Sequence, residues 1–521
     1  MAKEFLEMSW GNNPLYLLTE TQLKQIKEQS SLFYQEANQI DEITANDLDL
    51  NNTFIDMNAT LSGAGDFVLY HQLFNPCLTN ESLSNRTDLI KWALNHPNER
   101  KKARAFCFEA DKRYNDHLLL VTEKNLSNPN RIKFTYIHYF LLIMSILLGV
   151  FVPDFFILFT LLIIYGIFRY FAHHSQLSTT LDSVIYALNH IELARKLSKL
   201  SYTGCEDFQA NLKQLMDKLR KIHRPSNLDY FNSMKIFSGL MNWLTQGETL
   251  SYDKVTHLLY ENRETVKEAI IMVGRIDAAI AIASHITYKD VLQDIHLEET
   301  TTPFIMAKDM IHPLIKEAIS NDVDLHEHHL ITGSNATGKS SYLKMIALNA
   351  LMAQAFGFTH SKTYHASFLK IYTSMALGDS IMDGESYFVT EVKSLKRMLD
   401  KIDQTPSLCI IDEVLRGTNT QERIAASCEV LKAFANKNCI CLSATHDVEL
   451  TYLLEDTFKN GHFQEILINN KMTFDYHYHE GRSQSRNAIA LLNMLHYDPT
   501  IVSRAEQNYQ HFEKTGQWPI L

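Results

Sequence analysis

The stretch GSNATGKS, residues 333–340, constrains the fold of this chain more than any other feature of its sequence. It follows the apolar run HHLIT and precedes a segment whose apolar residues recur at helical spacing, so we expect it to connect a strand to a helix. Glycines in such a loop let backbone N–H groups close around phosphate oxygens, and the following helix adds the positive end of its dipole. The stretch therefore predicts an α/β layer with a phosphate-binding loop.

Each position of this loop has an expected task in holding ATP and Mg²⁺. The Lys339 ammonium would contact the outer phosphates, and the Ser340 hydroxyl would be a ligand of Mg²⁺. The predicted nucleotide-binding residues are Gly333, Ser334, Asn335, Ala336, Thr337, Gly338, Lys339, Ser340 and Ser341.

Two further apolar runs end in residues suited to ATP hydrolysis. SLCIIDE ends in Asp412, which could hold Mg²⁺ through a water molecule, and Glu413, which could orient and deprotonate the attacking water. LSATHD contains His446, whose imidazole could contact the γ-phosphate or that water, although a histidine in such a place is more often structural. Together the three runs predict an ATPase with Asp412 and Ser340 as metal ligands and Glu413 and His446 as catalytic residues.

The periodicity of apolar residues along the chain changes near residue 300. Residues 1–130 and 173–300 have apolar residues at helical spacing, whereas residues 301–521 alternate helical stretches with short β-rich runs. We therefore expect a helical region followed by an α/β nucleotide-binding domain. The expected strands are HHLITG, LKIYTSM, SLCIIDE, NCICLSATH, EILINN and FDYHYH.

A long apolar segment interrupts the helical region at residues 134–172. Asp154 is the only formally charged residue between positions 134 and 168, and Val152-Pro153-Asp154 is the expected turn of a helical hairpin. Both halves are long enough to span a membrane, the second only if Arg169 reaches the interface. Basic residues on both outer flanks predict a multi-pass protein of the cell membrane with the ATPase domain in the cytoplasm; these are Arg131, Lys133, Arg169, His173 and His174.

Two other interpretations of this segment stay open. It could be a buried helical hairpin in the core of a soluble domain, or a re-entrant hairpin that enters the membrane without crossing it.

Composition limits the remaining function classes. Lys and Arg number 49 against 60 Asp and Glu, which argues against one large nucleic-acid-binding face but leaves room for local basic patches. The clusters ERKKAR (residues 99–104) and KLRKIHR (residues 218–224) could meet phosphates, and equally could be solvated helix faces. The seven cysteines lack zinc-site spacing and indicate a reducing environment. The N-terminal residues lack the apolar core of a signal peptide.

The motifs resemble those of the MutS DNA mismatch repair ATPases. In TGSNATGKSSYLK the residues Thr332, Gly333, Asn335 and Tyr342 occupy positions typical of that family. Upstream, HPLI and ND are similar to MutS segments; downstream, GESYFVTEV, IIDEVLRGTNTQE and SATHDVEL are similar too. The resemblance is strong over about residues 305–505 and weaker over residues 53–92.

The resemblance implies an ABC-type P-loop ATPase domain in residues 301–521, a MutS core-like region in residues 1–130 and lever or core helices in residues 173–300. It implies a homodimer in which Ser386 contacts the nucleotide of the opposite subunit, and Arg416, Gly417 and Thr418 line the dimer-facing loop. It also implies ATP-dependent binding of mismatched, damaged or branched DNA. The apolar hairpin would lie where MutS lever helices run out to the DNA clamp.

Two departures from the family pattern leave alternatives open. Only about 45 residues precede the core-like segment, so we expect no mismatch-reading domain, and the residues around the Arg-Gly-Thr loop differ from the usual ones. One alternative is an ABC-type transport ATPase, although no Leu-Ser-Gly-Gly-Gln-like loop precedes the acidic strand. The other is a nucleotide-switched membrane scaffold that does not bind DNA.

Overall fold

A computed structural model describes most of the chain, and its residues divide into two compact units. The first unit comprises Met1–Ala37, Phe54–Gln72 and Ser84–Asp290, and the second comprises Asn38–Thr53, Leu73–Leu83 and Val291–Leu521. The described residues are 9–12, 18–34, 40–109, 126–221, 247–291, 294–334, 337–375, 387–415, 419–468, 471–482, 489, 492 and 496–519.

The first unit is helical, as the sequence predicts, and α15 is its central helix. α15 is 27 residues long, and most of its side chains from Val266 to Ile286 are buried. The buried carboxylate of Asp277 on α15 accepts hydrogen bonds from the backbone N–H groups of Leu61 (3.0 Å) and Ser62 (2.7 Å), which fixes the turn before α5. The helices up to residue 290 are α2 (Glu20–Phe33), α3 (Glu42–Asp47), α4 (Leu50–Met57), α5 (Gly63–Phe74), α6 (Asn80–Asn95), α7 (Pro97–Glu109), α9 (Pro129–Gly149), α10 (Phe155–Leu197), α11 (Glu206–Lys218), η1 (Leu219–Lys221), α14 (Gly247–Glu261) and α15 (Arg263–Lys289).

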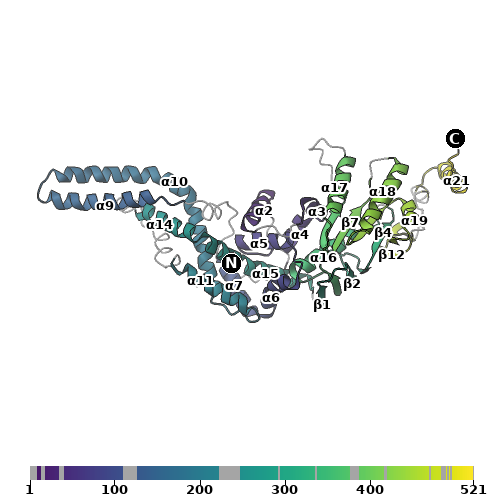
Figure 1. Ribbon diagram of the computed structural model, residues 1–521, viewed down its shortest axis with the longest axis horizontal. Helices are drawn as coiled ribbons and strands as arrows, with labels where there is room; N and C mark the ends of the chain where they lie inside the picture. Colours follow the sequence, from purple (N-terminus) through teal and green to yellow (C-terminus); the bar gives the residue numbers. More distant parts are fainter. Residues whose placement is uncertain are drawn as a thin grey trace. The chain divides into compact units, whose positions relative to one another are not determined.

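Helices α9 and α10 form the hairpin that the sequence predicts, with the turn at the expected Val152-Pro153-Asp154 (Figure 1). Asn128 caps α9 by accepting hydrogen bonds from two backbone N–H groups of its first turn. The hairpin presents large apolar side chains that are each more than half exposed: Phe134, Ile137, Phe140, Ile143, Leu147, Phe151, Ile157, Leu161, Ile164 and Phe168.

Among the described residues, two helices are long and apolar enough to cross a membrane, α9 and α15. They differ in burial: 22% of the apolar stretch of α9 is buried, whereas 89% of the apolar stretch of α15 is buried. α15 is thus the core helix of its unit, and the apolar surface of α9 and of the first part of α10 has no comparable protein cover.

Charged residues make hydrogen bonds at the end of this hairpin that is opposite its turn. The Arg131 guanidinium at the start of α9 binds both carboxylate oxygens of Asp253 on α14, at 2.6 and 2.7 Å. The Arg169 side chain, which the sequence predicts to reach the membrane interface, is buried and donates to the Arg131 carbonyl (3.2 Å) and the Thr135 hydroxyl (3.1 Å). The cause is that Arg169 faces α9, where these two oxygens satisfy its guanidinium.

The second unit contains the predicted strand layer. A six-stranded sheet has the order β12-β9-β4-β8-β7-β6, and all neighbours are parallel except β12 and β9. A four-stranded sheet has the order β1-β5-β2-β3, and β10 pairs with β11. The strands are β1 (Asp294–Glu298), β2 (Ile305–Met310), β3 (Asn321–Leu325), β4 (His328–Thr332), β5 (Thr363–Ser367), β6 (Lys370–Ser374), β7 (Ser407–Asp412), β8 (Cys439–Thr445), β9 (Phe458–His462), β10 (Glu465–Ile468), β11 (Lys471–Phe474) and β12 (His479–Glu480).

Helices cover the six-stranded sheet, which explains why β7 and β8 are buried at every position. Helices α17 (Tyr387–Lys401) and α18 (Thr420–Ala435) pack Met398, Leu431 and Phe434 against Cys409 and Cys441 of these strands. Helix α16 (Lys339–Phe356) contacts the same two strands. The described part of this unit also contains α3, α19 (Val448–Leu453) and α21 (Pro499–Thr515).

The expected strand FDYHYH is wrong in its middle. β11 ends at Phe474 and β12 begins at His479, because Tyr476 adopts a left-handed conformation with φ 56°. The Asn321 side chain replaces the missing strand pairing: it donates to the Tyr476 carbonyl (3.0 Å) and accepts from the Tyr478 N–H (2.8 Å). This connection holds Tyr476 beside the phosphate loop.

Candidate active site

The phosphate loop joins β4 to α16 and depends on two glycines with positive φ. Gly333 has φ 150°, and a Cβ atom there would lie 2.8 Å from the Phe463 carbonyl oxygen. Gly338 has φ 102°, and a Cβ atom there would lie 3.0 Å from the Tyr476 ring. Only glycine fits both positions without displacing its neighbours.

Lys339 lies at the mouth of this loop. Its ammonium donates to the carbonyl oxygens of Gly333 (2.7 Å) and Ser334 (2.8 Å), and the Thr337 hydroxyl donates to the same Ser334 carbonyl (2.8 Å). The side chain is thereby folded back over the loop, where a phosphate group would meet it. Asn335 and Ala336 lie outside the described residues.

Ser340 and Asp412 meet at the carboxyl edge of the sheet. The Ser340 hydroxyl donates to Asp412 Oδ2 at 2.5 Å. They come together because β4 and β7 are parallel to β8 between them, so that the loop after β4 and the last residue of β7 share one edge. A hydroxyl and a carboxylate are hard oxygen ligands of the kind that Mg²⁺ prefers, so this pair suits the predicted metal site.

Glu413 and His446 lie at the same edge and contact each other. His446 Nε2 is 2.9 Å from Glu413 Oε1, and both side chains are partly exposed. The Glu413 N–H donates to the Ala444 carbonyl of β8 (2.9 Å), which fixes Glu413 just beyond β7. Asp447 follows His446 in the sequence, and both of its carboxylate oxygens accept hydrogen bonds from Arg423 on α18, at 2.5 and 2.9 Å. The structure therefore brings together the acid and the histidine that the sequence selected separately.

The turn after β7 has a further support that sequence reasoning missed. Glu391 on α17 is buried, and its Oε1 accepts a hydrogen bond of 2.6 Å from the Leu415 N–H. No local pattern distinguishes Glu391 from the other polar residues of α17, since its task depends on a partner 24 positions away.

A cavity of about 530 Å³ adjoins the loop, and sequence reasoning missed most of its walls. Tyr476 lies on one side, and Gly338 and Ser341 of the loop region contribute to the lining. Burial, aided by Lys344, lowers the pKa of His312 to about 4, so its imidazole is neutral near pH 7. The lining residues are His312, Ile315, Glu317, Ala318, Ile319, Asn321, Gly338, Ser341, Tyr342, Met345, Phe474, Asp475 and Tyr476.

Four residues implied by the family resemblance cannot be placed. Ser386, Arg416, Gly417 and Thr418 lie outside the described residues. The described segments that flank them, the start of α17 and the turn ending at Leu415, are those joined by Glu391.

The basic cluster at residues 99–104 is mainly structural. Arg104 is buried and donates to the Ser9 hydroxyl (2.7 Å), and the Arg100 guanidinium lies 3.7 Å from the centre of the Trp10 ring. Lys102 pairs with Glu99 at 2.8 Å. Arg100 and Arg104 are thus used in packing, whereas Lys101 and Lys102 are exposed. In the second cluster, residues 222–224 are outside the described part of the chain.

Comparison with known proteins agrees with this geometry. The family model described as MutS domain V matches residues 329–513. This segment is therefore similar to MutS domain V, which is an ABC-type P-loop ATPase domain. The match confirms the predicted ATPase activity class.

Curated relatives extend the similarity beyond MutS domain V. A DNA mismatch repair protein MutS from Clostridium botulinum (strain 657 / Type Ba4) is 29% identical over 285 residues, which cover 50% of this chain and 29% of the relative. One from Chlamydia muridarum (strain MoPn / Nigg) is 28% identical over 282 residues, covering 51% of this chain and 34% of the relative. The similarity thus spans about half of this chain and about a third of the relatives' length.

Proposed function

We propose that the chain hydrolyses ATP at the carboxyl edge of the six-stranded sheet, with the roles that the sequence predicts. In this proposal the backbone of residues 333–341 holds the phosphates, Lys339 neutralises them, and Ser340 and Asp412 hold Mg²⁺. The observation that carries the proposal is the convergence of Ser340, Asp412, Glu413 and His446 on one edge, from three separate segments of sequence.

Hydrolysis needs a water molecule in line with the γ-phosphate and a group that accepts its proton. Glu413 is suited to that role because its carboxylate is partly exposed and lies one residue beyond the metal-binding Asp412. His446, at 2.9 Å from it, orients the carboxylate and can contact the γ-phosphate. The cavity beside Gly338 is of a size for the nucleoside, with Tyr476 available for stacking on the base.

Two variants separate ATP binding from hydrolysis. Lys339→Ala removes the charge that faces the phosphates, so ATP binding should fall sharply. Glu413→Gln keeps the shape of the site but cannot accept a proton, so ATP should still bind while turnover falls by at least about 100-fold. Binding of a fluorescent ATP analogue and steady-state phosphate release measure the two effects. Normal turnover in Glu413→Gln would remove the role proposed for this carboxylate.

We propose further that the chain acts as a dimer that binds DNA in an ATP-dependent way. The support is the match to MutS domain V together with relatives that are DNA mismatch repair proteins. Binding to homoduplex, mismatched and branched DNA, measured with the Glu413→Gln protein with and without ATP, tests this. Affinity that falls steeply between about 50 and 200 mM salt indicates phosphate contacts, and a difference between the DNAs indicates recognition. An affinity that is the same for all three DNAs and does not change with salt would contradict the proposal.

We also propose that the α9–α10 hairpin attaches the chain to the cell membrane, with the ATPase domain on the cytoplasmic side. The support is its unbroken exposed apolar surface and the ion pair at its base, between Arg131 and Asp253. In a liposome flotation assay the full chain should float with the vesicles. Phe140→Asp together with Ile164→Asp places charges in that surface and should reduce flotation, whereas Val448→Asp, on exposed α19, should not. A wild-type protein that stays with the soluble fraction without detergent would contradict attachment.

A second candidate function is a nucleotide-switched membrane scaffold that does not bind DNA. The observation in its favour is that Arg100 packs on the Trp10 ring and Arg104 donates to Ser9, so two of the four cations in residues 99–104 bind within the protein. Retained flotation and ATP turnover with no DNA binding would support this second function over the first.

A further inference from the structure

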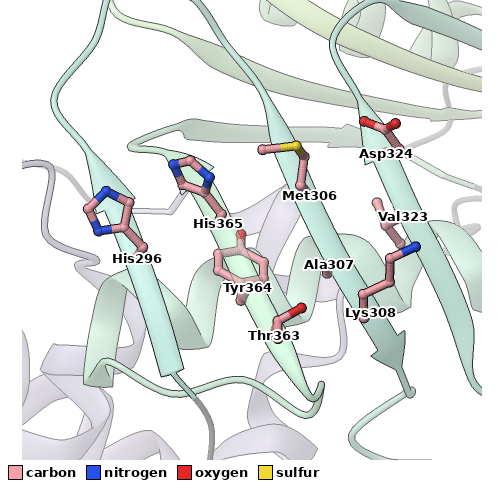
Figure 2. A pocket seen from close by; sticks show the side chains of 9 residues that line it. All are labelled: His296, Met306, Ala307, Lys308, Val323, Asp324, Thr363, Tyr364 and His365. Carbon is pink, nitrogen blue, oxygen red and sulfur yellow. The ribbon is translucent and has the colours of Figure 1, made fainter.

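The four-stranded sheet, which does not contain the strand before the phosphate loop, carries a row of metal-ligating side chain types on one face. His296 on β1 is the register partner of His365 on β5, which is the partner of Met306 on β2, itself the partner of Asp324 on β3. Register partners point to the same side of a sheet. Figure 2 shows the two imidazoles next to each other and Met306 beside them.

Glu298 completes a compact cluster with the two histidines. It lies two residues beyond His296 on β1, so its side chain is on the same face. Glu298 Oε1 is 2.7 Å from His365 Nε2 and 3.4 Å from His296 Nε2. Among the described residues these three offer ligand atoms that all lie within 4.8 Å of one another.

The spacing of these atoms is close to that of a tetrahedral site. Bonds of about 2.0–2.1 Å to zinc place two ligand atoms roughly 3.3 Å apart. The two distances to Glu298, 2.7 and 3.4 Å, lie on either side of that value, and all three ligand atoms are within 4.8 Å of one another. Small rotations of the exposed side chains would equalise them. Two imidazoles and one carboxylate, with one position left for water, form an established ligand set for Zn²⁺.

Phe304 packs against one of the three side chains, and all three are accessible to solvent. The edge of the Phe304 ring packs against the His365 ring, with centroids 4.9 Å apart. The side chains of His296, Glu298 and His365 are 66%, 43% and 38% exposed, so an ion can reach them without unfolding the sheet.

An ordinary surface ion pair is the competing explanation. Elsewhere in the described residues such pairs join one histidine to one carboxylate, as in His326 with Asp324 at 3.2 Å and His257 with Glu261 at 3.2 Å. The cluster differs because two imidazoles, from different strands, share one carboxylate. Two protonated imidazoles with ring centroids 4.8 Å apart would repel each other, whereas neutral imidazoles can both bind a cation.

We propose that His296, Glu298 and His365 bind one divalent transition-metal ion, with Zn²⁺ as the best match to the ligand set. The ion would join β1 to β5 at the edge of the four-stranded sheet, in addition to their backbone pairing. This site is separate from the proposed Mg²⁺ site, whose ligands are oxygens alone.

Co²⁺ and Zn²⁺ titrations of the full chain, freed of metal with a chelator and kept in excess Mg²⁺ without nucleotide, test the proposal. The wild-type protein should bind one Co²⁺ with the visible absorption of a four-coordinate site, and Zn²⁺ should displace it. His365→Ala and Glu298→Gln should each weaken binding more than about tenfold. His326→Ala removes an equally accessible histidine that has one carboxylate partner, and should bind like the wild type.

His296→Gln provides a check on folding, because His296 is the most exposed ligand and its replacement leaves the sheet intact. It should lose metal affinity while retaining the circular dichroism spectrum and the ATP turnover of the wild type. Absence of a cobalt spectrum in the wild type, or unchanged affinity in His296→Gln and His365→Ala, would overturn the proposal. Because the metal titrations need neither ATP nor DNA, their result is independent of the proposed function.

Discussion

Glu413 and Leu415 both adopt left-handed backbone conformations, with φ 63° and φ 60°. Such conformations cost a residue with a side chain roughly 1–2 kcal/mol, so they persist only where the surroundings hold them. Hydrogen bonds from Glu413 N–H to the Ala444 carbonyl and from Leu415 N–H to Glu391 provide that hold. The strained turn aims the Glu413 side chain away from the strand direction and toward His446.

A pH-dependent contribution to stability arises at His329, on β4. Burial, aided by Lys459, lowers its pKa to about 4, and its Nδ1 lies 2.9 Å from the Tyr478 hydroxyl. An unfolded histidine has a pKa near 6.5, so the unfolded chain binds the proton first and stability falls as pH drops from about 6.5 toward 4.

His329→Gln keeps a polar partner for Tyr478 and removes this titration. The loss in free energy of unfolding between pH 7 and pH 4.5 should shrink by on the order of 2 kcal/mol relative to the wild type. Denaturant unfolding across this pH range measures it, and His326→Gln, at an exposed histidine, is the matched control. Equal acid sensitivity of His329→Gln and the wild type would show that His329 titrates normally.

At the scale of elements, Glu391 joins α17 to the turn after β7, which contains Glu413 and Leu415. Glu391→Ala would leave the buried Leu415 N–H without its acceptor, which costs about 1–3 kcal/mol and releases the strained turn. We expect turnover to fall more than ATP affinity, with Glu391→Gln intermediate because an amide oxygen can still accept the bond. Glu429→Ala, an exposed acid on α18, is the control. A pure loss of thermal stability with unchanged turnover per folded protein would contradict the coupling.

The elements that depend on local pattern were predictable from the sequence. The phosphate loop, the apolar strands β4, β7 and β8, and the hairpin turn each follow from neighbouring residues. Features that depend on residues far away in the sequence were not predictable. Asp47 on α3 accepts hydrogen bonds from the Thr373 hydroxyl (2.6 Å) and the Met375 N–H (2.9 Å), which places residues 38–53 in the second unit. The left-handed turn at Tyr476 likewise depends on Asn321, more than a hundred residues away.

At the scale of the whole molecule, the proposed dimer has a direct test. The family resemblance implies that Ser386 would complete the ATP site of the opposite subunit, and a contact strengthened in the transition state affects turnover more than ATP affinity. Ser386→Ala and Lys339→Ala chains should each have little activity alone. In a mixed dimer the Ser386→Ala chain keeps its Lys339 and receives the partner's Ser386, so one site is restored. Phosphate release measured on confirmed mixed dimers should rise; no recovery would contradict a shared site.

Helix α10 is continuous over 43 residues, from the apolar hairpin to its packing against α15. At 1.5 Å per residue its length is about 65 Å, and its helical hydrogen bonding is continuous, so a tilt at one end is transmitted to the other. A rotation of about 5° at one end would displace the other end by roughly 6 Å. A small change in packing around α15 would thus become a large movement at the hairpin tip, and a hairpin fixed in a bilayer would resist that movement mechanically. Membrane tension or thickness could in this way act on the core of the helical unit.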